Sequence, residues 1–189
     1  HYPLRRQRQM CIRDRTNGSL PYWSITSAGN ISGGAREVSK LLNSAKPLLG
    51  KNNYVIGVFD HDSAGLQEFR GLKPAIFSTE IRDTVKKHKT SNIFGLCIPV
   101  PGELDFYLKK EQEYNTFEIE HYFDIDFLKS QDVVEPTPFS ESIYKIKDKK
   151  KTKFSKYIRT LNDPKIFTNF IELFNQIDKI TNKDIDYEN

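Results

Sequence analysis

The chain has 189 residues and a formal net charge of +4, and 37% of its residues are hydrophobic and 12% aromatic. This length allows one compact domain with an appendage, and the aromatic content excludes a chain that is disordered throughout. No apolar run approaches the length of a membrane span and no signal-peptide pattern occurs, so we expect no membrane partner. Only Cys11 and Cys97 are cysteines, which excludes a disulfide framework and leads us to expect a reducing, cytoplasmic environment.

The positive charge comes from one segment. Residues 1–15 carry five arginines against a single acidic residue, Asp14, so residues 16–189 are neutral overall. The opening letters, HYPLRRQRQMCIRDR, resemble translated sequencing-adapter read-through at the end of an environmental gene fragment. We therefore expect residues 1–15 to be a non-native tail and the natural protein to extend upstream of Thr16.

Two predicted elements precede the main motif. Residues 21–27 alternate and predict a short strand, and the apolar residues from Ala35 to Leu49 recur at helical spacing and predict an amphipathic helix. Gly33 and Gly34 predict a tight turn before that helix rather than a phosphate cradle, because the pattern G-x-G-x-x-G is absent. A strand at 54–59 then completes a β-α-β order, which is typical of parallel strands with a right-handed crossover.

Residues 54–65, YVIGVFDHDSAG, carry the main functional pattern. The apolar run from Tyr54 to Phe59 predicts a buried strand that leads directly to Asp60 and Asp62. Ligands of open α/β sheets bind at the carboxyl ends of the strands, and residues two apart on an extended chain point to the same side. Two carboxylates in this position suit Mg²⁺ or Mn²⁺. Asp62 is equally suited to capping a following helix.

The next part of the chain predicts a helix and another strand. Residues 63–72 have helical periodicity, with Leu66 and Phe69 facing the core. The continuous apolar run at 92–100 predicts a third buried strand, and Cys97 in its middle is interpreted as a small buried thiol. His61 is interpreted as a packing or surface residue rather than a metal ligand.

Residues 117–123, FEIEHYF, lie in an acidic part of the chain. If this segment is extended, Glu118 and Glu120 share one face. We expect such a strand edge to complete the oxygen shell begun by Asp60 and Asp62.

Residues 145–159 are rich in lysine, which is typical of a solvated face and also fits contact with phosphates. Aromatic and aliphatic residues at helical spacing then predict a helical hairpin over 151–181, with Asp163 and Pro164 at the start of its second helix. We expect the aromatic stripe of this hairpin to form core rather than a binding face.

Together these patterns resemble the Toprim domain, the metal-binding fold of topoisomerases, primases and overcoming-lysogenization-defect (OLD) family nucleases. The resemblance rests on the helix after Gly33 and Gly34, on FDHDSAG at 59–65 and on IEHYF at 119–123. It is strongest with the OLD-like branch, in which a Toprim nuclease domain follows an ABC-type ATPase domain. The resemblance implies an α/β fold of Toprim-like, Rossmann-like type, with a mostly parallel sheet flanked by helices and a C-terminal helical extension.

The resemblance also implies a domain division and a set of site residues. The Toprim-like domain would cover residues 16–135, and a lysine-rich linker with the helical extension would cover 136–189. The Glu-Gly pair of the family's first strand is missing, so we expect the fragment to lack that strand and to be catalytically incomplete. The implied metal ligands are Asp60, Asp62 and either Glu120 or its neighbour Glu118. The implied basic catalytic residue is Lys151 or Lys153.

The implied function is a Mg²⁺- or Mn²⁺-dependent DNA endonuclease that acts in defence against phage. Its partners would be DNA and a missing N-terminal ATPase domain through which ATP acts, and a homodimer is compatible with the resemblance. Two alternatives remain open. One is a non-catalytic interaction or regulatory module of an ATPase complex, which the missing Glu permits. The other is a haloacid-dehalogenase-like phosphatase with Asp60 as nucleophile and Asp62 as acid/base, from whose pattern Ala64 and Gly65 depart.

Overall fold

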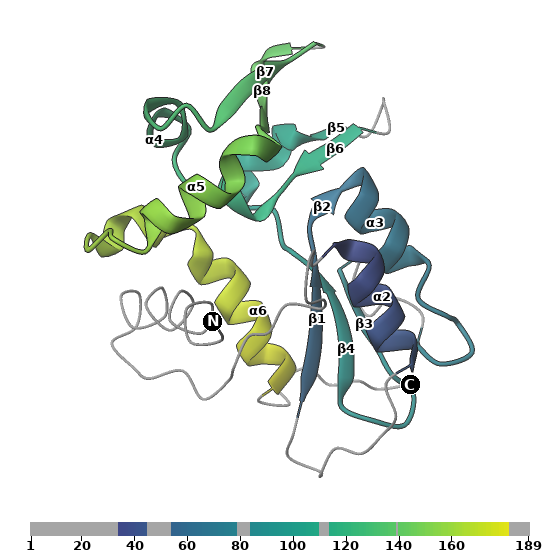
Figure 1. Cartoon of the computed structure of the whole chain (residues 1–189). Helices are drawn as coiled ribbons and strands as arrows, with labels where there is room; N and C mark the ends of the chain where they lie inside the picture. The colour runs from purple at the N-terminus through teal and green to yellow at the C-terminus, as the bar shows by residue number, and fades with distance from the viewer. Residues whose placement is uncertain (1–33, 45–53, 79–83, 110–113, 139, 182–189) are drawn as a thin grey trace. The chain divides into compact units, whose positions relative to one another are not determined.

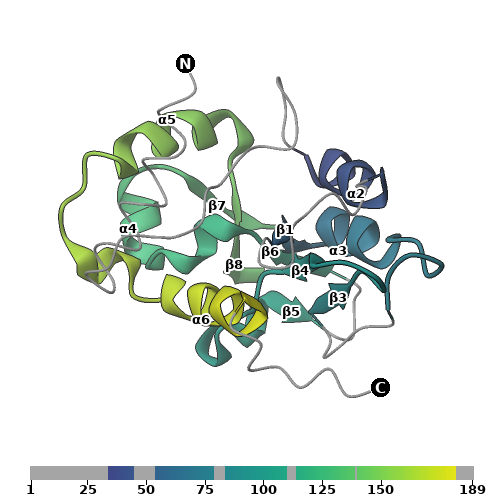
Figure 2. The same ribbon diagram turned by 90° about the horizontal axis from the view of Figure 1, so that it is seen from below.

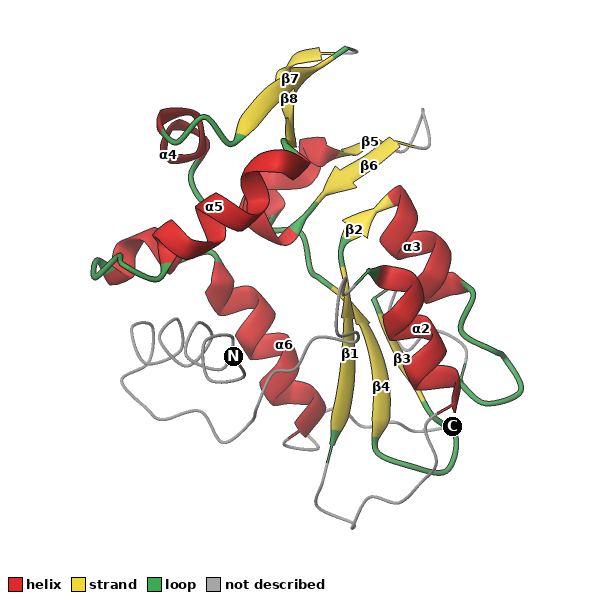
Figure 3. Cartoon of the chain, in the orientation of Figure 1, coloured by secondary structure: helices red, strands yellow, loops and turns green. Residues whose placement is uncertain are grey.

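The computed structural model describes residues 34–44, 54–78, 84–109, 114–138 and 140–181. Short helices and short strands alternate along these residues, so the structure belongs to the mixed α/β class (Figures 1 and 3). No helix among them combines the length and the apolar character of a membrane span. The tail expected at 1–15, the strand expected at 21–27 and the turn residue Gly33 lie outside the described residues.

The described residues group into two compact units. The first unit consists of residues 34–117 and 175–181, and the second unit consists of residues 118–174. The helices and strands of the first unit, apart from the end of α6, are α2 (Ala35–Ser44), β1 (Val55–Phe59), β2 (His61–Asp62), α3 (Ser63–Arg70), β3 (Val85–Lys87), β4 (Ile93–Cys97), the 3₁₀ helix η1 (Gly102–Tyr107), β5 (Leu108–Lys109) and β6 (Tyr114–Phe117).

The main sheet of the first unit has the strand order β1-β4-β3. β1 and β4 are parallel, whereas β3 is antiparallel to β4. A second small sheet, with the order β2-β6-β5, is antiparallel throughout. The sheets are therefore small and mixed among the described residues rather than mostly parallel, because only the β1–β4 connection includes a helix long enough to return the chain in the same direction.

The hydrophobic runs of the sequence become the central strands and the helix between them. β1 and α3 lie where the patterns at 54–59 and 63–72 predict them, with Leu66 and Phe69 buried and Gly71 capping the end of α3. All five residues of β4 are buried, as the run at 92–100 predicts. The helix predicted from Ala35 is α2 as far as Ser44, beyond which the predicted helix leaves the described residues.

β1 is less buried than its composition predicts. Only Phe59 is fully buried, while Val55 and Val58 are each 37% exposed. The reason is that β1 pairs with β4 alone among the described strands, so it forms an edge of the described sheet. Val58 and Val55 also alternate between the two faces of the strand, so both faces are partly open to solvent.

Two glycines allow the helices to approach the parallel strands closely. Gly57 of β1 and Gly95 of β4 are register partners. A Cβ on Gly57 would lie 2.6 Å from Leu42 Cδ1 of α2, and a Cβ on Gly95 would lie 2.6 Å from Leu72 Cδ1, just after α3. α2 and α3 therefore cover one face of the β1–β4 pair and lie side by side (Figure 2).

The second unit begins directly after β6. β7 and β8 form an antiparallel hairpin, and Glu135 and Pro136 both pair with β8, so the domain boundary expected between residues 135 and 136 falls inside a strand. The helices and strands of this unit are η2 (Ile119–Tyr122), α4 (Ile125–Ser130), β7 (Val134–Thr137), β8 (Ser140–Ile146), α5 (Asp148–Ile158), η3 (Pro164–Phe167) and the start of α6 (Phe170–Thr181).

An aromatic cluster forms the core of the second unit. Phe123 is at its centre, with ring centroids of Phe154, Phe167 and Phe170 at 5.4, 5.6 and 5.0 Å. The expected aromatic stripe is thus core in this unit, as predicted. The second helix of the expected hairpin is divided, because Asp163 caps the 3₁₀ helix η3 and α6 starts only at Phe170.

The glycine pair gives a direct test of the fold. Gly95→Val would force a branched side chain into the space of Leu72 and Phe69, and we expect the free energy of unfolding to fall by about 2 kcal/mol. The matched control is Gly102→Val, since a Cβ at Gly102 meets no atom within 4 Å. Urea denaturation of both variants measures the difference, and equal losses would contradict this packing.

Candidate functional site

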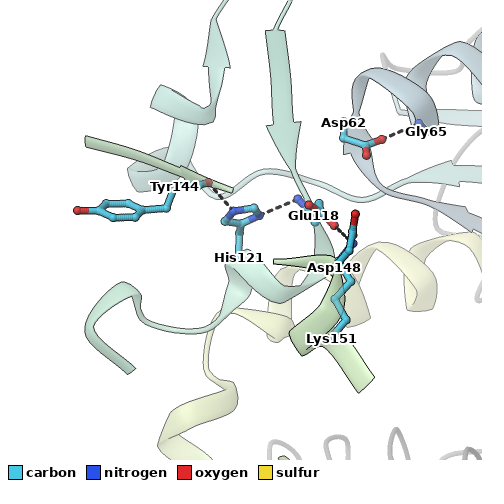
Figure 4. Close-up of polar contacts among 7 residues, drawn as sticks. All are labelled: Asp62, Gly65, Glu118, His121, Tyr144, Asp148 and Lys151. Atoms are coloured by element: carbon cyan, nitrogen blue, oxygen red, sulfur yellow. Dashed lines mark hydrogen bonds and ion pairs between the residues drawn. The ribbon is translucent and has the colours of Figure 1, made fainter. Parts of the chain in front are cut away.

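The two aspartates of the main motif lie at the carboxyl end of β1. Asp60 follows the last residue of β1, and Asp62 ends the short strand β2 and caps α3. Asp62 Oδ1 accepts a hydrogen bond from the Gly65 backbone N–H at 2.6 Å (Figure 4). The helix-cap interpretation of Asp62 is thereby confirmed, and it leaves Oδ2 without a hydrogen bond or ion pair to the described residues.

Gly65 is required by the shape of this loop. A Cβ at this position would lie 2.1 Å from the backbone oxygen of Asp60 and 3.0 Å from Asp62 Oδ1. Backbone atoms cannot move aside as a flexible side chain can, so a larger residue would displace the first turn of α3 from Asp60. Gly65 thus sets the spacing between the two aspartates and the helix.

The end of β4 holds the same loop from the other side. The Phe59 carbonyl accepts the Ile98 N–H at 2.9 Å, and the Cys97 thiol donates to the Asp60 carbonyl at 3.6 Å. His61 Nδ1 lies 3.2 Å from the Ile98 carbonyl and must carry the proton of that hydrogen bond. Burial lowers the pKa of His61, so its ring is a neutral packing group as the sequence predicts.

The segment with the predicted glutamates has a different conformation from the one expected. Phe117 ends β6, Glu118 is the N-cap of η2 and Glu120 lies within that 3₁₀ helix. The segment 117–123 is therefore not an extended strand, and the two glutamates do not share a strand face. The physical reason is the His121 side chain, which bonds back to the start of the turn.

His121 fixes the turn through both ring nitrogens. The Glu118 backbone N–H donates to Nδ1 at 2.8 Å, and Nε2 lies 3.0 Å from the Tyr144 carbonyl in β8 (Figure 4). Because Nδ1 accepts and a carbonyl can only accept, the ring is the neutral Nε2–H tautomer. Burial lowers the pKa of His121 to about 4, with a smaller lowering from Lys151, against the opposing effect of the hydrogen bond to the Tyr144 carbonyl.

Lys151 of α5 joins this turn through an ion pair with Glu118. It also contacts Asp148 Oδ1 at 3.1 Å (Figure 4). Burial opposes the charge of Lys151, but the hydrogen bond and attraction of Glu118, with smaller attractions from Glu120 and Asp148, raise the pKa of the ammonium overall. The Glu118 side chain is only 14% exposed, and it also accepts the His121 backbone N–H in a capping box.

The predicted site residues are divided between the units. Asp60 and Asp62 belong to the first unit, whereas the second unit brings Glu118, Glu120 and Lys151 together. No group of three or more His, Cys, Asp or Glu side chains that could hold a metal occurs within the part of the chain that the structure describes. Lys153, the second predicted basic residue, is an exposed residue of α5.

Sequence reasoning did not find two residues that shape these regions. The role of Gly65 depends on a contact with the Asp60 backbone, and the only local signal is a glycine three residues after an N-cap aspartate. The role of His121 depends on Tyr144, which is 23 residues away, so no local pattern indicates it.

Comparisons of this chain with protein-family models, with curated proteins and with solved structures find no match.

The His121 contacts predict a pH dependence of stability. The folded-state pKa of His121 lies below the unfolded value of 6.5. The contribution of the neutral ring to the free energy of unfolding is therefore complete above pH 6.5 and is lost as the pH falls towards 4. We expect about 2 kcal/mol of this contribution to be lost between about pH 7.5 and about pH 5. His121→Asn keeps an acceptor for the Glu118 N–H but does not titrate. Urea denaturation should show a smaller loss in this variant, and identical pH dependences would contradict the assignment.

Proposed function

We propose that this chain contains the metal-binding part of a nuclease that hydrolyses phosphodiester bonds in DNA. The observation that carries the proposal is the position of Asp60 and Asp62, which follow a parallel strand at its carboxyl end. Ligand sites of α/β sheets concentrate at this edge. Two carboxylates separated by one residue in this position are a suitable start for a Mg²⁺ or Mn²⁺ site.

The chemistry of these side chains fits a hard divalent cation. Carboxylate oxygens are the ligands that Mg²⁺ and Mn²⁺ prefer. Asp62 is held in one orientation by the Gly65 N–H, and its Oδ2 remains for a cation. A bound Mg²⁺ or Mn²⁺ supplies Lewis-acid stabilisation of the negative charge that develops on a phosphodiester.

The second unit carries the predicted basic residues. Lys151 keeps its proton throughout the physiological pH range because Glu118, Glu120 and Asp148 raise the pKa of its ammonium. The resemblance gives the basic catalytic role to Lys151 or Lys153; the charge of Lys151 is shared with Glu118 and Asp148, whereas Lys153 is exposed, and an ammonium group in this role would offset negative charge on a phosphate. The resemblance of IEHYF to the metal-binding motif of the OLD-like branch supports Glu120 as the further metal ligand, with its neighbour Glu118 as the alternative.

The proposal extends to the family and the setting. We propose that the fold is of the Rossmann-like Toprim type and that the intact protein is an OLD-like nuclease in which an ABC-type ATPase domain precedes this region. The resemblance of FDHDSAG and IEHYF to that branch supports this extension. DNA is then the substrate, ATP acts through the ATPase domain, and defence against phage is the role.

Metal binding and cleavage test the proposal together. Asp60→Ala/Asp62→Ala removes both carboxylates at the end of β1, and we expect calorimetric titration with Mn²⁺ to lose its saturable signal. In the protein with its upstream ATPase domain, we expect Mg²⁺-dependent cleavage of DNA to fall by more than about 100-fold, since the metal contributes several kcal/mol of charge stabilisation.

The matched control is Glu103→Ala/Asp105→Ala, which removes the same charge from two exposed residues of η1. Unchanged cleavage in the Asp60/Asp62 variant would overturn the nuclease proposal. Equal, weak metal uptake by all three proteins would favour the interaction-module alternative. Turnover of an aryl phosphate that depends on Asp60 would instead support the phosphatase alternative.

A further inference from the structure

The lysine-rich segment of the second unit divides into paired and unpaired lysines. Lys147 and Lys150 contact the two carboxylate oxygens of Asp132 at 2.5 and 2.6 Å, and Lys145 contacts Glu135 at 2.8 Å. Lys151 pairs with Glu118. Much of the positive charge that the sequence gathers at 145–159 is thus directed to carboxylates of the same unit.

These ion pairs keep the acidic partners charged. Hydrogen bonds and attraction from Lys147 and Lys150 lower the pKa of Asp132 to about 2. Lys145 likewise lowers the pKa of Glu135. The two carboxylates therefore stay charged at every physiological pH and offset two of the three positive charges of Lys145, Lys147 and Lys150.

Three lysines of α5 are different. Lys149, Lys153 and Lys156 are exposed and make no ion pair with the described residues. Their spacing of four and three residues places them on one face of the helix. We call this set the lysine stripe, and at 1.5 Å per residue it is about 10 Å long.

An aromatic ring and an arginine flank the lysine stripe. Tyr157 follows Lys153 by one helical turn and is 37% exposed, with its ring stacked on Phe127 at a centroid distance of 6.2 Å. Arg159 follows Lys156 by three residues, and its buried Nε donates to no acceptor among the residues that the structure describes. Arg159 adds a further positive charge at the end of the lysine stripe.

We propose that the lysine stripe, together with Tyr157 and Arg159, binds a single-stranded segment of nucleic acid. The ammonium groups contact successive phosphates, and the exposed ring of Tyr157 stacks on a base. This inference rests on the proposed function in taking the bound strand as the substrate of the nuclease.

The helix lacks the features of a membrane-surface helix. Such a helix exposes a wide apolar face beside its lysines. In α5 the aromatic residue Phe154 is only 3% exposed and packs against Phe123 in the core. Tyr157, held by its stacking on Phe127, is the one large hydrophobic side chain of α5 that is exposed. A rigid ring of this kind suits stacking better than insertion into lipid.

Fluorescence anisotropy tests the inference with a labelled oligonucleotide of about 20 nucleotides, either single-stranded or in a duplex. The buffer contains EDTA, so that binding is measured without metal-dependent cleavage. The test variant of the 189-residue chain is Lys149→Gln/Lys153→Gln/Lys156→Gln. The control, Lys145→Gln/Lys147→Gln/Lys150→Gln, removes the same charge from paired lysines of the same segment. All proteins keep the arginines of residues 1–15, so these contribute equally.

We expect the stripe variant to bind the single strand at least about 10-fold more weakly, with the slope of log affinity against log salt reduced by about 2. The control should lose less than about threefold. Tyr157→Ala should weaken single-strand binding by about 5-fold or more and leave duplex binding unchanged. Equal losses in the stripe and control variants would overturn the inference, as would equal losses of single-strand and duplex binding in Tyr157→Ala.

Two further measurements separate this inference from the proposed function. Stripe-dependent binding to phosphatidylserine vesicles in place of oligonucleotides would overturn the assignment to nucleic acid. Glu103→Ala/Asp105→Ala, which alters exposed residues outside both proposed sites, should bind the single strand as the unaltered chain does. If the protein with its ATPase domain cleaves nothing while stripe-dependent binding persists, the nuclease proposal fails and the binding site stands.

Discussion

The close contact of two helices with a pair of parallel strands determines where the candidate site begins. Gly57 and Gly95 occupy neighbouring positions in the register of β1 and β4, and the absence of a side chain at each lets α2 and α3 lie directly on the strands. Gly65 repeats this arrangement at the end of β1, where the first turn of α3 lies against the Asp60 backbone. Asp60 and Asp62 are therefore held by packed backbone on several sides, which is the condition for a preorganised site.

In the second unit the corresponding constraint is polar. His121 joins the Glu118 backbone to β8, and Lys151 joins the Glu118 carboxylate to α5. Both bonds meet at Glu118, the N-cap residue of η2, so the turn carrying Glu120 is fixed from two elements at once. Four lysines of the lysine-rich segment thus pair with carboxylates of the unit, whereas Lys149, Lys153 and Lys156 are exposed and make no ion pair with the described residues. Composition alone does not indicate which of these lysines are paired and which present their charge to solvent.

The sequence predicts those parts that depend on neighbouring residues. The strand ending at Phe59 and the buried strand around Cys97 follow from local apolar runs, and the cap at Asp62 follows from its side-chain bond to the backbone N–H three residues later. The turn at 119–122 does not follow, because its alternation is compatible with a strand, and the ion pair of Glu118 with Lys151 spans 33 residues. Likewise, the exposure of Val55 depends on which strands flank β1, and the residues of β1 alone do not indicate which strands pair with it.

The hydrogen bond of Cys97 to the Asp60 carbonyl has a practical consequence. The thiol is fully buried in β4 beside the loop that carries both aspartates, so a thiol reagent reaches it only when this part of the sheet opens. In a variant with Cys11→Ser, the labelling rate of Cys97 measures how often the structure opens at the end of β1. Slower labelling in the presence of a divalent cation would show how strongly cation binding at the aspartates closes the loop. The measurement uses a side chain that does not itself bind the cation.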